Sequence, residues 1–362
     1  FVKACLNPKV QVMEKVDKIT GDQKVKEFKK KDQKFGISTI LKEIVDFKGW
    51  EIIFKVLLFC FVAWGAYALY VVYLFHHDAS FAEIPKFSIY DFKLALIPTL
   101  VWFLYKHACI KVFYNWVYNG LDASKFKSEE ERSARALKGV TWMSNIIYYS
   151  CSSALAYFLF KDTFFFPTQL GGSGNVADIY KYTPYVPPIA HAVMFYQIQF
   201  GWHFHTLIDH VVYKWRDPKF WEMFLHHSVA VFLIFFSYLC NQVPVGILVL
   251  VTHDPSDIGL CASRFYNDRK NKKMPILAAI YFLFMASWVF LRLYVFPKCV
   301  VGHAFVSLWN YEKDLMYPVY LYMILMMSAL VILHIYWFTF IVRILLGLFS
   351  NKQDYNTYDK KK

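Results

Sequence analysis

The sequence predicts an all-α protein, a polytopic membrane helix bundle of about eight transmembrane helices. Hydrophobic residues make up 57% of the 362 positions, and they gather into runs of about 20 residues, the length an α-helix needs to cross a bilayer. Charged residues crowd instead into the two ends and a few connections. Tandem soluble domains would not show this spacing, so we expect one membrane domain with a polar tail at each end.

The eight apolar runs define the predicted helices in chain order. The third run is the weakest prediction, because Asn145 and several serines interrupt its apolar character. The predicted spans are 52–75, 93–116, 137–160, 187–213, 221–241, 243–264, 274–296 and 317–347.

The predicted organisation has four parts. Residues 1–51 form a basic tail, in which 37–50 places its apolar residues on one helical face and therefore predicts an interfacial helix. Residues 52–90 hold the first span and a lumenal loop, 91–347 hold the main helical domain, and 348–362 form a second basic tail.

The connections carry their own signals. Aromatic, Gly and Pro residues gather in 161–188 and again in 297–318, which predicts structured loops at headgroup level. The stretch 117–136 contains SEEERSARA, which predicts a short helix of mixed charge.

The distribution of Lys and Arg predicts the orientation. Both tails and the connections 117–138, 214–219 and 264–273 hold most of them. The positive-inside rule therefore places both termini in the cytosol of a multi-pass protein. The net charge of +13 suits anionic membrane lipids and phosphate-bearing substrates. Nucleic acid is not an expected partner, because no basic domain is separable from the membrane.

Five ionisable residues stand out inside two adjacent apolar runs, where such groups are costly and point to function. A hairpin turning near Gln242 would place His227 and Asp257 each about 15 residues from the turn, which is roughly 22 Å along a helix. All five would then share one layer, nearer the cytosolic face. They are His226, His227, His253, Asp254 and Asp257.

Other spans supply candidates at a similar depth. Trp202 and His205, with His203 between them, lie in the cytosolic half of the fourth span, and His334 lies near the middle of the last. Arg292 falls towards the lumenal end of the seventh span, where we expect it to snorkel or pair with a loop.

A histidine oriented by a carboxylate can act as a general base or a nucleophile. That chemistry suits acyl transfer from a thioester to an amine or hydroxyl in a cavity with little water. Two other hypotheses remain: a His and carboxylate metal site, and polar contacts that only join helices. The histidines lack the spacing of di-iron membrane enzymes, and the seven scattered cysteines predict neither a disulfide framework nor a zinc site.

The ordered motifs resemble the Lag1 motif of ceramide synthases in the TLC-domain family. They are the HH pair, FSYxxN at Phe236 to Asn241, Gly246, and HDxSD at His253 to Asp257. The lead-in RDPKFWEMFLHH, the segment FMASWVFLRLYVFP at 284–297 and the closing LHIYWFTFIVRIL at 333–345 are also similar. The resemblance covers roughly residues 90–347, and it implies that the domain 91–347 has the TLC fold.

The resemblance implies transfer of a fatty acyl group from acyl-CoA to the amine of a long-chain sphingoid base, in the endoplasmic reticulum membrane. The five polar residues would be catalytic, with no cofactor and no metal. A homodimer or a small regulatory subunit is the expected partner. The substrate-binding candidates are Asn241, Ser256, Trp202, His205, His334 and Arg264.

Three positions depart from the family pattern. Cys261 stands where the family usually has Glu, Arg264 stands where it has Lys, and Pro255 should kink the helix beside the site. Two alternatives therefore stay open: an acyltransferase with another acceptor, and a non-catalytic member that binds lipid or serves as an accessory subunit of a membrane complex.

Overall fold

The computed structural model describes residues 43–44, 46–47, 49–82, 86–183, 186–187, 189–311 and 314–349. Most of the predicted tails 1–51 and 348–362, and of the interfacial helix predicted at 37–50, lies outside these residues. Gly49–Ile335 form one compact unit, to which the following description applies. The described residues from Tyr336 onward belong to a second unit, in which the rings of Tyr336 and Phe340 meet edge to face at 5.0 Å.

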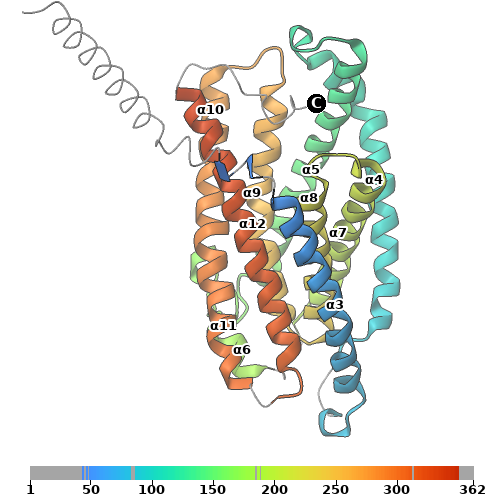
Figure 1. Cartoon of the computed structure of the whole chain (residues 1–362), viewed down its shortest axis with the longest axis vertical. Helices are drawn as coiled ribbons and strands as arrows, with labels where there is room; N and C mark the ends of the chain where they lie inside the picture. The colour runs from blue at the N-terminus through green and yellow to red at the C-terminus, as the bar shows by residue number, and fades with distance from the viewer. Residues whose placement is uncertain are drawn as a thin grey trace, which may run out of the picture. The chain divides into compact units, whose positions relative to one another are not determined.

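The predicted fold class is confirmed: the described residues form helices and no strand, and a long helix covers each predicted span (Figure 1). Within the described residues, six helical segments are long and apolar enough to cross a membrane. Helices α5 and α7 are not among them, so the count of eight remains a prediction. The helices are α3 (Trp50–His77), α4 (Phe92–Gly120), α5 (Glu129–Phe160), α7 (Ala192–Lys214), α8 (Phe220–Leu239), α9 (Val243–Asn267), α10 (Met274–Ser287) and α12 (Tyr317–Phe349).

The short helix predicted within 117–136 is in fact the start of α5. The Ser128 side chain accepts from the backbone N–H of Glu131 and caps the helix, and three glutamates occupy the first turn. Both features stabilise a helix N-terminus. No proline follows, and α5 runs without interruption through Gly139 to Phe160.

The loop predicted at 297–318 is wrong over its first half. After α10 the chain continues as a π-helix, η5 (Trp288–Val301), and then as α11 (Gly302–Leu308). Pro297 lies inside η5 and does not end the helical path.

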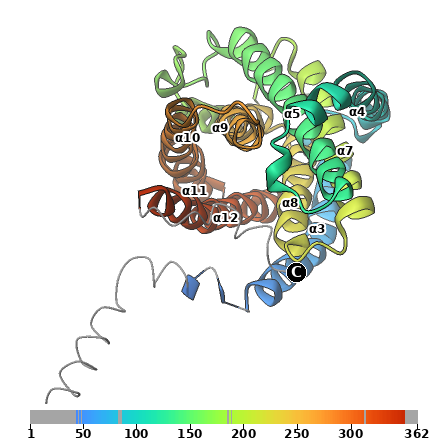
Figure 2. The ribbon, with the colours of Figure 1, turned by 90° about the horizontal axis from the view of Figure 1, so that it is seen from above.

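Helix α9 lies at the centre of the packing. It contacts α5, α10, η5 and α8, while α7 packs on both α4 and α8. Figure 2 shows α9 between α10 and α5. Helix α3 contacts α8, and the Tyr322 hydroxyl of α12 donates to the Phe61 carbonyl of α3 across 2.9 Å. A polar residue on α9 is therefore within reach of several helices.

The connection 161–188 is structured over its described residues, as predicted. It contains α6 (Ala177–Tyr182), and it buries Phe165 and Phe166 completely. The amide of Gly174 donates to the Phe166 carbonyl across 2.8 Å. This loop packs through its own aromatic side chains, so it presents α6 at a fixed place.

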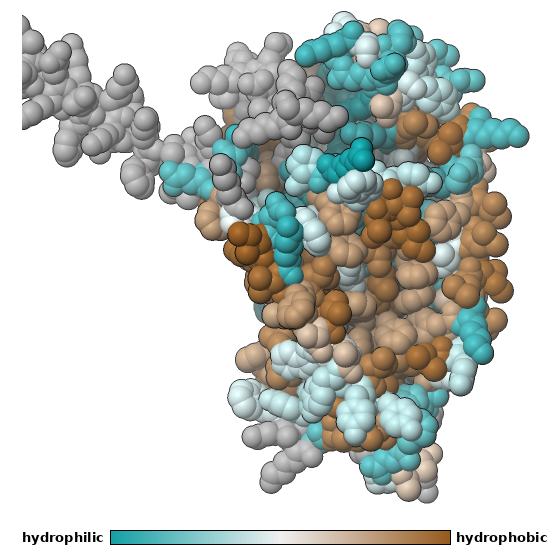
Figure 3. Space-filling model, turned by 45° about the vertical axis from the view of Figure 1, so that its right-hand side comes forward, coloured by the Kyte–Doolittle hydropathy of each residue, from teal (hydrophilic) through white to brown (hydrophobic). Residues whose placement is uncertain are grey.

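Large apolar side chains on α3 and α4 are exposed. Phe59 of α3 is 73% exposed and Val112 of α4 is 67% exposed. On the face in Figure 3, apolar side chains fill the middle and hydrophilic ones gather towards the top and bottom. Helix surfaces of this kind suit contact with lipid chains.

Candidate active site

The predicted helical hairpin is present. Helix α8 ends at Leu239 and α9 begins at Val243. The turn between them places Asn241 in the left-handed region with φ of 56°, and the Gln242 amide donates to the Ser237 carbonyl across 2.7 Å. Asn tolerates this conformation better than most residues, so the sequence supports a tight turn here.

The hairpin brings the five predicted polar residues to one cavity of about 620 Å³. We call it the polar cavity, and its wall includes His226, His227, His253, Asp254 and Asp257. Tyr149 of α5 and Trp202, His203 and Thr206 of α7 add to its polar and aromatic lining. The common depth predicted from helix rise alone is therefore observed.

His253 has hydrogen bonds at both ring nitrogens. Nδ1 donates to the Val249 carbonyl one turn earlier, and Nε2 lies 3.1 Å from Nε2 of His334. A carbonyl only accepts, so Nδ1 carries a proton, and Nε2 of the neutral ring then accepts from His334. With both nitrogens engaged, His253 is suited to orient its neighbours rather than to take the substrate proton itself.

Arg292 does not snorkel or pair with a loop, as its position in the sequence suggested. It is 2% exposed, and Nη2 lies 2.7 Å from Oδ2 of Asp257 and 3.0 Å from the His253 carbonyl oxygen. Its guanidinium also covers the Trp288 ring at 4.2 Å. The prediction failed because η5 turns this side chain inward, towards α9.

Asp254 ends a relay of buried hydrogen bonds through α5 and α7. The Tyr148 hydroxyl donates to Gln199 Oε1 at 2.6 Å, Gln199 Nε2 donates to Ser152 Oγ at 2.5 Å, and Ser152 Oγ donates to Asp254 Oδ2 at 2.5 Å. None of these partners was predicted, although the serines that interrupt the third span were a visible signal for Ser152.

The adjacent histidines of α8 face the same cavity. The rings of His226 and His227 lie 5.4 Å apart, and His210 of α7 lies 5.4 Å from His227. Within the described part of the chain, the buried Nδ1 of His227 has no hydrogen-bond partner. A ring nitrogen in this state can accept a proton or attack a substrate carbon.

The two substrate-binding candidates on α7, Trp202 and His205, have different surroundings. Trp202 lines the polar cavity and stacks on Tyr148 at 3.6 Å. His205 is absent from the described lining and instead meets Phe103 of α4 at 4.4 Å. Its role in substrate binding stays a prediction, and the structure places its ring against α4.

Three further candidates lie away from the polar cavity. Ser256 is buried and donates to the His253 carbonyl at 2.9 Å within α9. Asn241 sits in the hairpin turn, at the other end of α9, and donates to the Val186 carbonyl at 3.3 Å. Arg264 is exposed, about two turns beyond Asp257. The structure gives the first two a role in local packing, and it places Arg264 near a helix end.

Two positions noted as departures also lie in α9. The helix continues through Pro255 from Val243 to Asn267. Cys261 is buried one turn after Asp257.

Among the described residues, no three His, Cys, Asp or Glu side chains are grouped to hold a metal ion.

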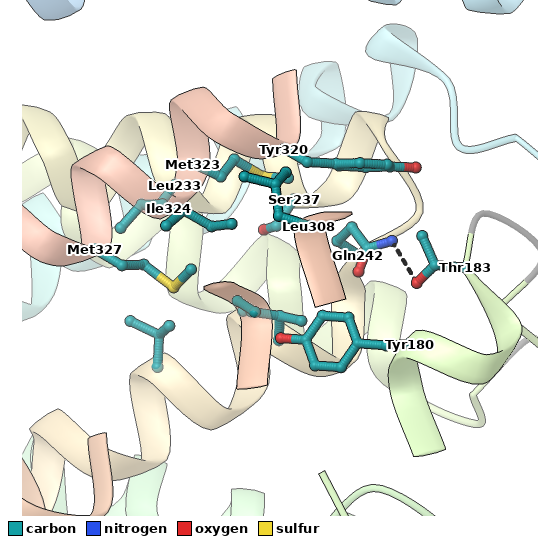
Figure 4. A pocket seen from close by; sticks show the side chains of 14 residues that line it. Tyr180, Thr183, Leu233, Ser237, Gln242, Leu308, Tyr320, Met323, Ile324 and Met327 are labelled. Carbon is teal, nitrogen blue, oxygen red and sulfur yellow. Dashed lines mark hydrogen bonds between the residues drawn. The ribbon is translucent and has the colours of Figure 1, made fainter. Parts of the chain in front are cut away.

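A second cavity of about 510 Å³ adjoins the first and shares Leu233, Gly246 and Val249 with it. We call it the apolar pocket. Tyr180 and Gln242 lie towards one end and Met327 towards the other (Figure 4). Its lining is almost wholly hydrocarbon, which suits an alkyl chain better than water.

Comparison with known proteins supports the family resemblance seen in the sequence motifs. The family model described as the TLC domain matches residues 139–343. ASC1-like protein 3 of Oryza sativa subsp. japonica is 27% identical over 237 residues, which cover 64% of this chain and 79% of the rice protein.

Two further relatives match over shorter regions. Ceramide synthase hyl-1 of Caenorhabditis elegans is 32% identical over 161 residues, 41% of this chain and 43% of that protein. Sphingosine N-acyltransferase lag1 of Schizosaccharomyces pombe is 28% identical over 221 residues, 58% of this chain and 53% of that protein. The alignments thus span about half the length of these two relatives. The match to the family model covers more than half of the 362 residues, and the chain belongs to the TLC-domain family.

Proposed function

We propose that the chain is a ceramide synthase, which transfers a fatty acyl group from acyl-CoA to the amine of a sphingoid base. The observation that carries the proposal is the convergence of His226, His227, His253, Asp254 and Asp257 on one cavity. The names of the Caenorhabditis elegans and Schizosaccharomyces pombe relatives support the same reaction class.

The reaction needs a base and a protected site. The amine nitrogen attacks the thioester carbon, the C–N bond forms, and the C–S bond breaks to release CoA. The amine proton passes to a histidine and then to the leaving sulfur. A cavity between helices limits hydrolysis of the thioester, because little water reaches it.

The hydrogen bonds support a division of roles among the polar residues. His226 and His227 supply the base, or the nucleophile if an acyl-imidazole forms, because the nitrogens of His253 are already engaged. Asp257 is held by Arg292, and Asp254 is held by Ser152. Both carboxylates line the cavity with these histidines, and in this proposal they stabilise the imidazolium as the proton moves.

Charge supports the placement of the substrates. The basic connections suit the phosphates of CoA, so we propose that acyl-CoA enters from the cytosolic side and that both ends of the chain face the cytosol. The apolar pocket, which adjoins the polar cavity, would hold an alkyl chain. The membrane would be that of the endoplasmic reticulum, and the reaction would need no metal.

The direct test is an acyl-CoA and sphinganine assay on the purified full chain. His227→Ala and Asp257→Ala should each lower product formation at least about 100-fold, the usual contribution of a positioned acid or base. His107→Ala is the matched control, because this histidine is exposed on α4 and, among the described residues, its ring bonds the Phe103 carbonyl of its own helix. A chelator should leave the rate unchanged.

Other outcomes would change the assignment. Product that survives both substitutions would show that the polar cavity is not the site. Turnover only with a different amine or hydroxyl acceptor would identify another acyltransferase. No acyl transfer to any acceptor, with lipid still bound, would identify a non-catalytic family member.

A further inference from the structure

The two cavities together follow one face of α9. Asp257, His253, Val249 and Val245 succeed one another at intervals of four residues, and all four line one cavity or the other. Residues with this spacing share a helix face. From Asp257 to Gln242 the path is roughly 22 Å long, so a substrate whose reacting group lies among the histidines can extend its chain into the apolar pocket.

The far end of this path is built by a segment outside the long helices. Tyr180 and Thr183, in and just after α6, line the apolar pocket beside Gln242 of the hairpin turn. In Figure 4 these three residues lie together on the side away from Met327. They stand at the end farther from the polar cavity.

Two hydrogen bonds fix that segment to the hairpin. Gln242 Nε2 donates to Thr183 Oγ1 at 3.0 Å, and Asn241 Nδ2 donates to the Val186 carbonyl at 3.3 Å. Asn241 and Gln242 are themselves buried. The position of Tyr180 is therefore set by the same turn that sets the depth of the histidines.

We propose that Tyr180 sets the maximum length of the alkyl chain that this protein accepts, by closing the far end of the apolar pocket with its ring. The inference rests on the proposed function, since the chain belongs to the fatty acyl group or to the sphingoid base. Each methylene that reaches past the ring has nowhere to be buried, and a buried methylene is worth about four-fold in binding.

The test compares three substitutions of one residue. Tyr180→Ala should shift the preference in a series of saturated acyl-CoAs towards longer chains, by up to about four-fold in kcat/KM for each added methylene. Tyr180→Trp should shift it towards shorter chains. Tyr180→Phe keeps the ring and should leave the profile unchanged.

Tyr182 provides the matched control. It lies on the same helix, is 48% exposed, and is not part of the pocket lining. Tyr182→Ala should therefore keep the wild-type profile. A variant that is merely less stable loses total activity without a change in chain-length preference, so opposite shifts for Ala and Trp exclude that explanation.

Two parallel substrate series identify which alkyl chain occupies the pocket, and a binding measurement repeats the comparison without turnover. One varies the acyl-CoA with a fixed base, and the other varies the sphingoid base with a fixed acyl-CoA. Thermal stabilisation by S-alkyl CoA thioethers and by free bases of increasing length gives the same comparison without a reaction. A shift in either series supports the proposal.

The proposal is overturned if neither series shifts in Tyr180→Ala and Tyr180→Trp, or if Tyr182→Ala shifts them equally. An inactive wild-type protein that still shows these binding shifts would contradict the proposed function but not the role of Tyr180. Normal wild-type activity with unchanged chain-length profiles in the Tyr180 variants would contradict the role of Tyr180 but not the proposed function.

Discussion

Arg292 Nη2 lies 2.7 Å from Oδ2 of Asp257, and the arginine side chain is almost completely enclosed. The same nitrogen also donates to the His253 carbonyl at 3.0 Å. One guanidinium thus fixes two site positions one turn apart on α9. A charge in such a place needs its partner, because an unpaired ion away from water is costly.

Arg292→Met should destabilise the protein by up to about 3 kcal/mol, less than at a fully buried ion pair, because it leaves the Asp257 carboxylate, whose side chain is 20% exposed, without its partner. Activity should fall with it. The stability and activity of Arg292→Lys should lie between those of wild type and Arg292→Met, since an ammonium keeps the charge but not the planar geometry of the guanidinium. Unfolding in detergent and turnover measured on the same preparations check this.

The double variant Arg292→Met with Asp257→Asn separates the two effects. It removes both charges, so stability should partly return while activity stays low. Full activity in Arg292→Met alone would contradict the arrangement.

Ser152→Ala should weaken the site through Asp254. It removes a donor to a buried carboxylate, an interaction worth about 1.5–3 kcal/mol, and leaves Gln199 Nε2 without its acceptor. We expect a lower kcat and a lower unfolding temperature. The neighbouring Ser153 is the control, because its buried hydroxyl has no hydrogen-bond partner among the described residues. Equal effects of both substitutions would exclude a specific role for the relay.

His334→Phe should lower kcat at least about ten-fold with little change in KM. It removes the donor at Nε2 of His253, and an unsatisfied buried acceptor costs about 1–3 kcal/mol. His334→Gln, which keeps an N–H donor, should recover part of the rate. The measurement is kcat and the KM for sphinganine at saturating acyl-CoA. A change in KM alone would indicate instead that His334 contacts the substrate.

Lys125, in the connection between α4 and α5, should make stability depend on pH. Burial, with the nearby Lys272 ammonium as the second cause, lowers the pKa of Lys125 from 10.5 to about 8. Between these values the unfolded chain binds more protons, so stability should rise with pH across that window, and below about pH 8 the folded state bears the cost of the buried ammonium.

Lys125→Met should therefore raise the unfolding temperature at neutral pH and flatten its rise above pH 8. The control is Lys127→Met, an exposed lysine in the same connection. Parallel pH curves for wild type and Lys125→Met would contradict the prediction.

The number of membrane crossings can be settled by a glycosylation acceptor placed in the loop after α5. If α5 and α7 both cross, residues 161–176 face the lumen and the acceptor is modified. If only the six more apolar segments cross, this loop faces the cytosol and stays unmodified. An acceptor in 121–128 should remain unmodified in either case, which controls for misinsertion.

The sequence predicted the helices because an apolar run of about 20 residues has few alternatives in lipid. It also predicted the layer of His226, His227 and Asp257, since equal distances from a tight turn fix equal depth. It misjudged helix ends at Glu129 and beyond residue 296, where capping and π-winding are local effects that hydropathy does not report.

By itself, the sequence thus determined the long helices, the hairpin and the family, each of which depends on local periodicity or on ordered motifs. Tertiary structure decided which polar groups meet. Arg292 reaches Asp257 through the winding of η5, Ser152 reaches Asp254 through the packing of α5 on α9, and His205 turns away from the cavity. The physical reason is that rise along a helix gives depth, whereas the direction of a side chain depends on rotation and on the neighbouring helix, which only packing sets.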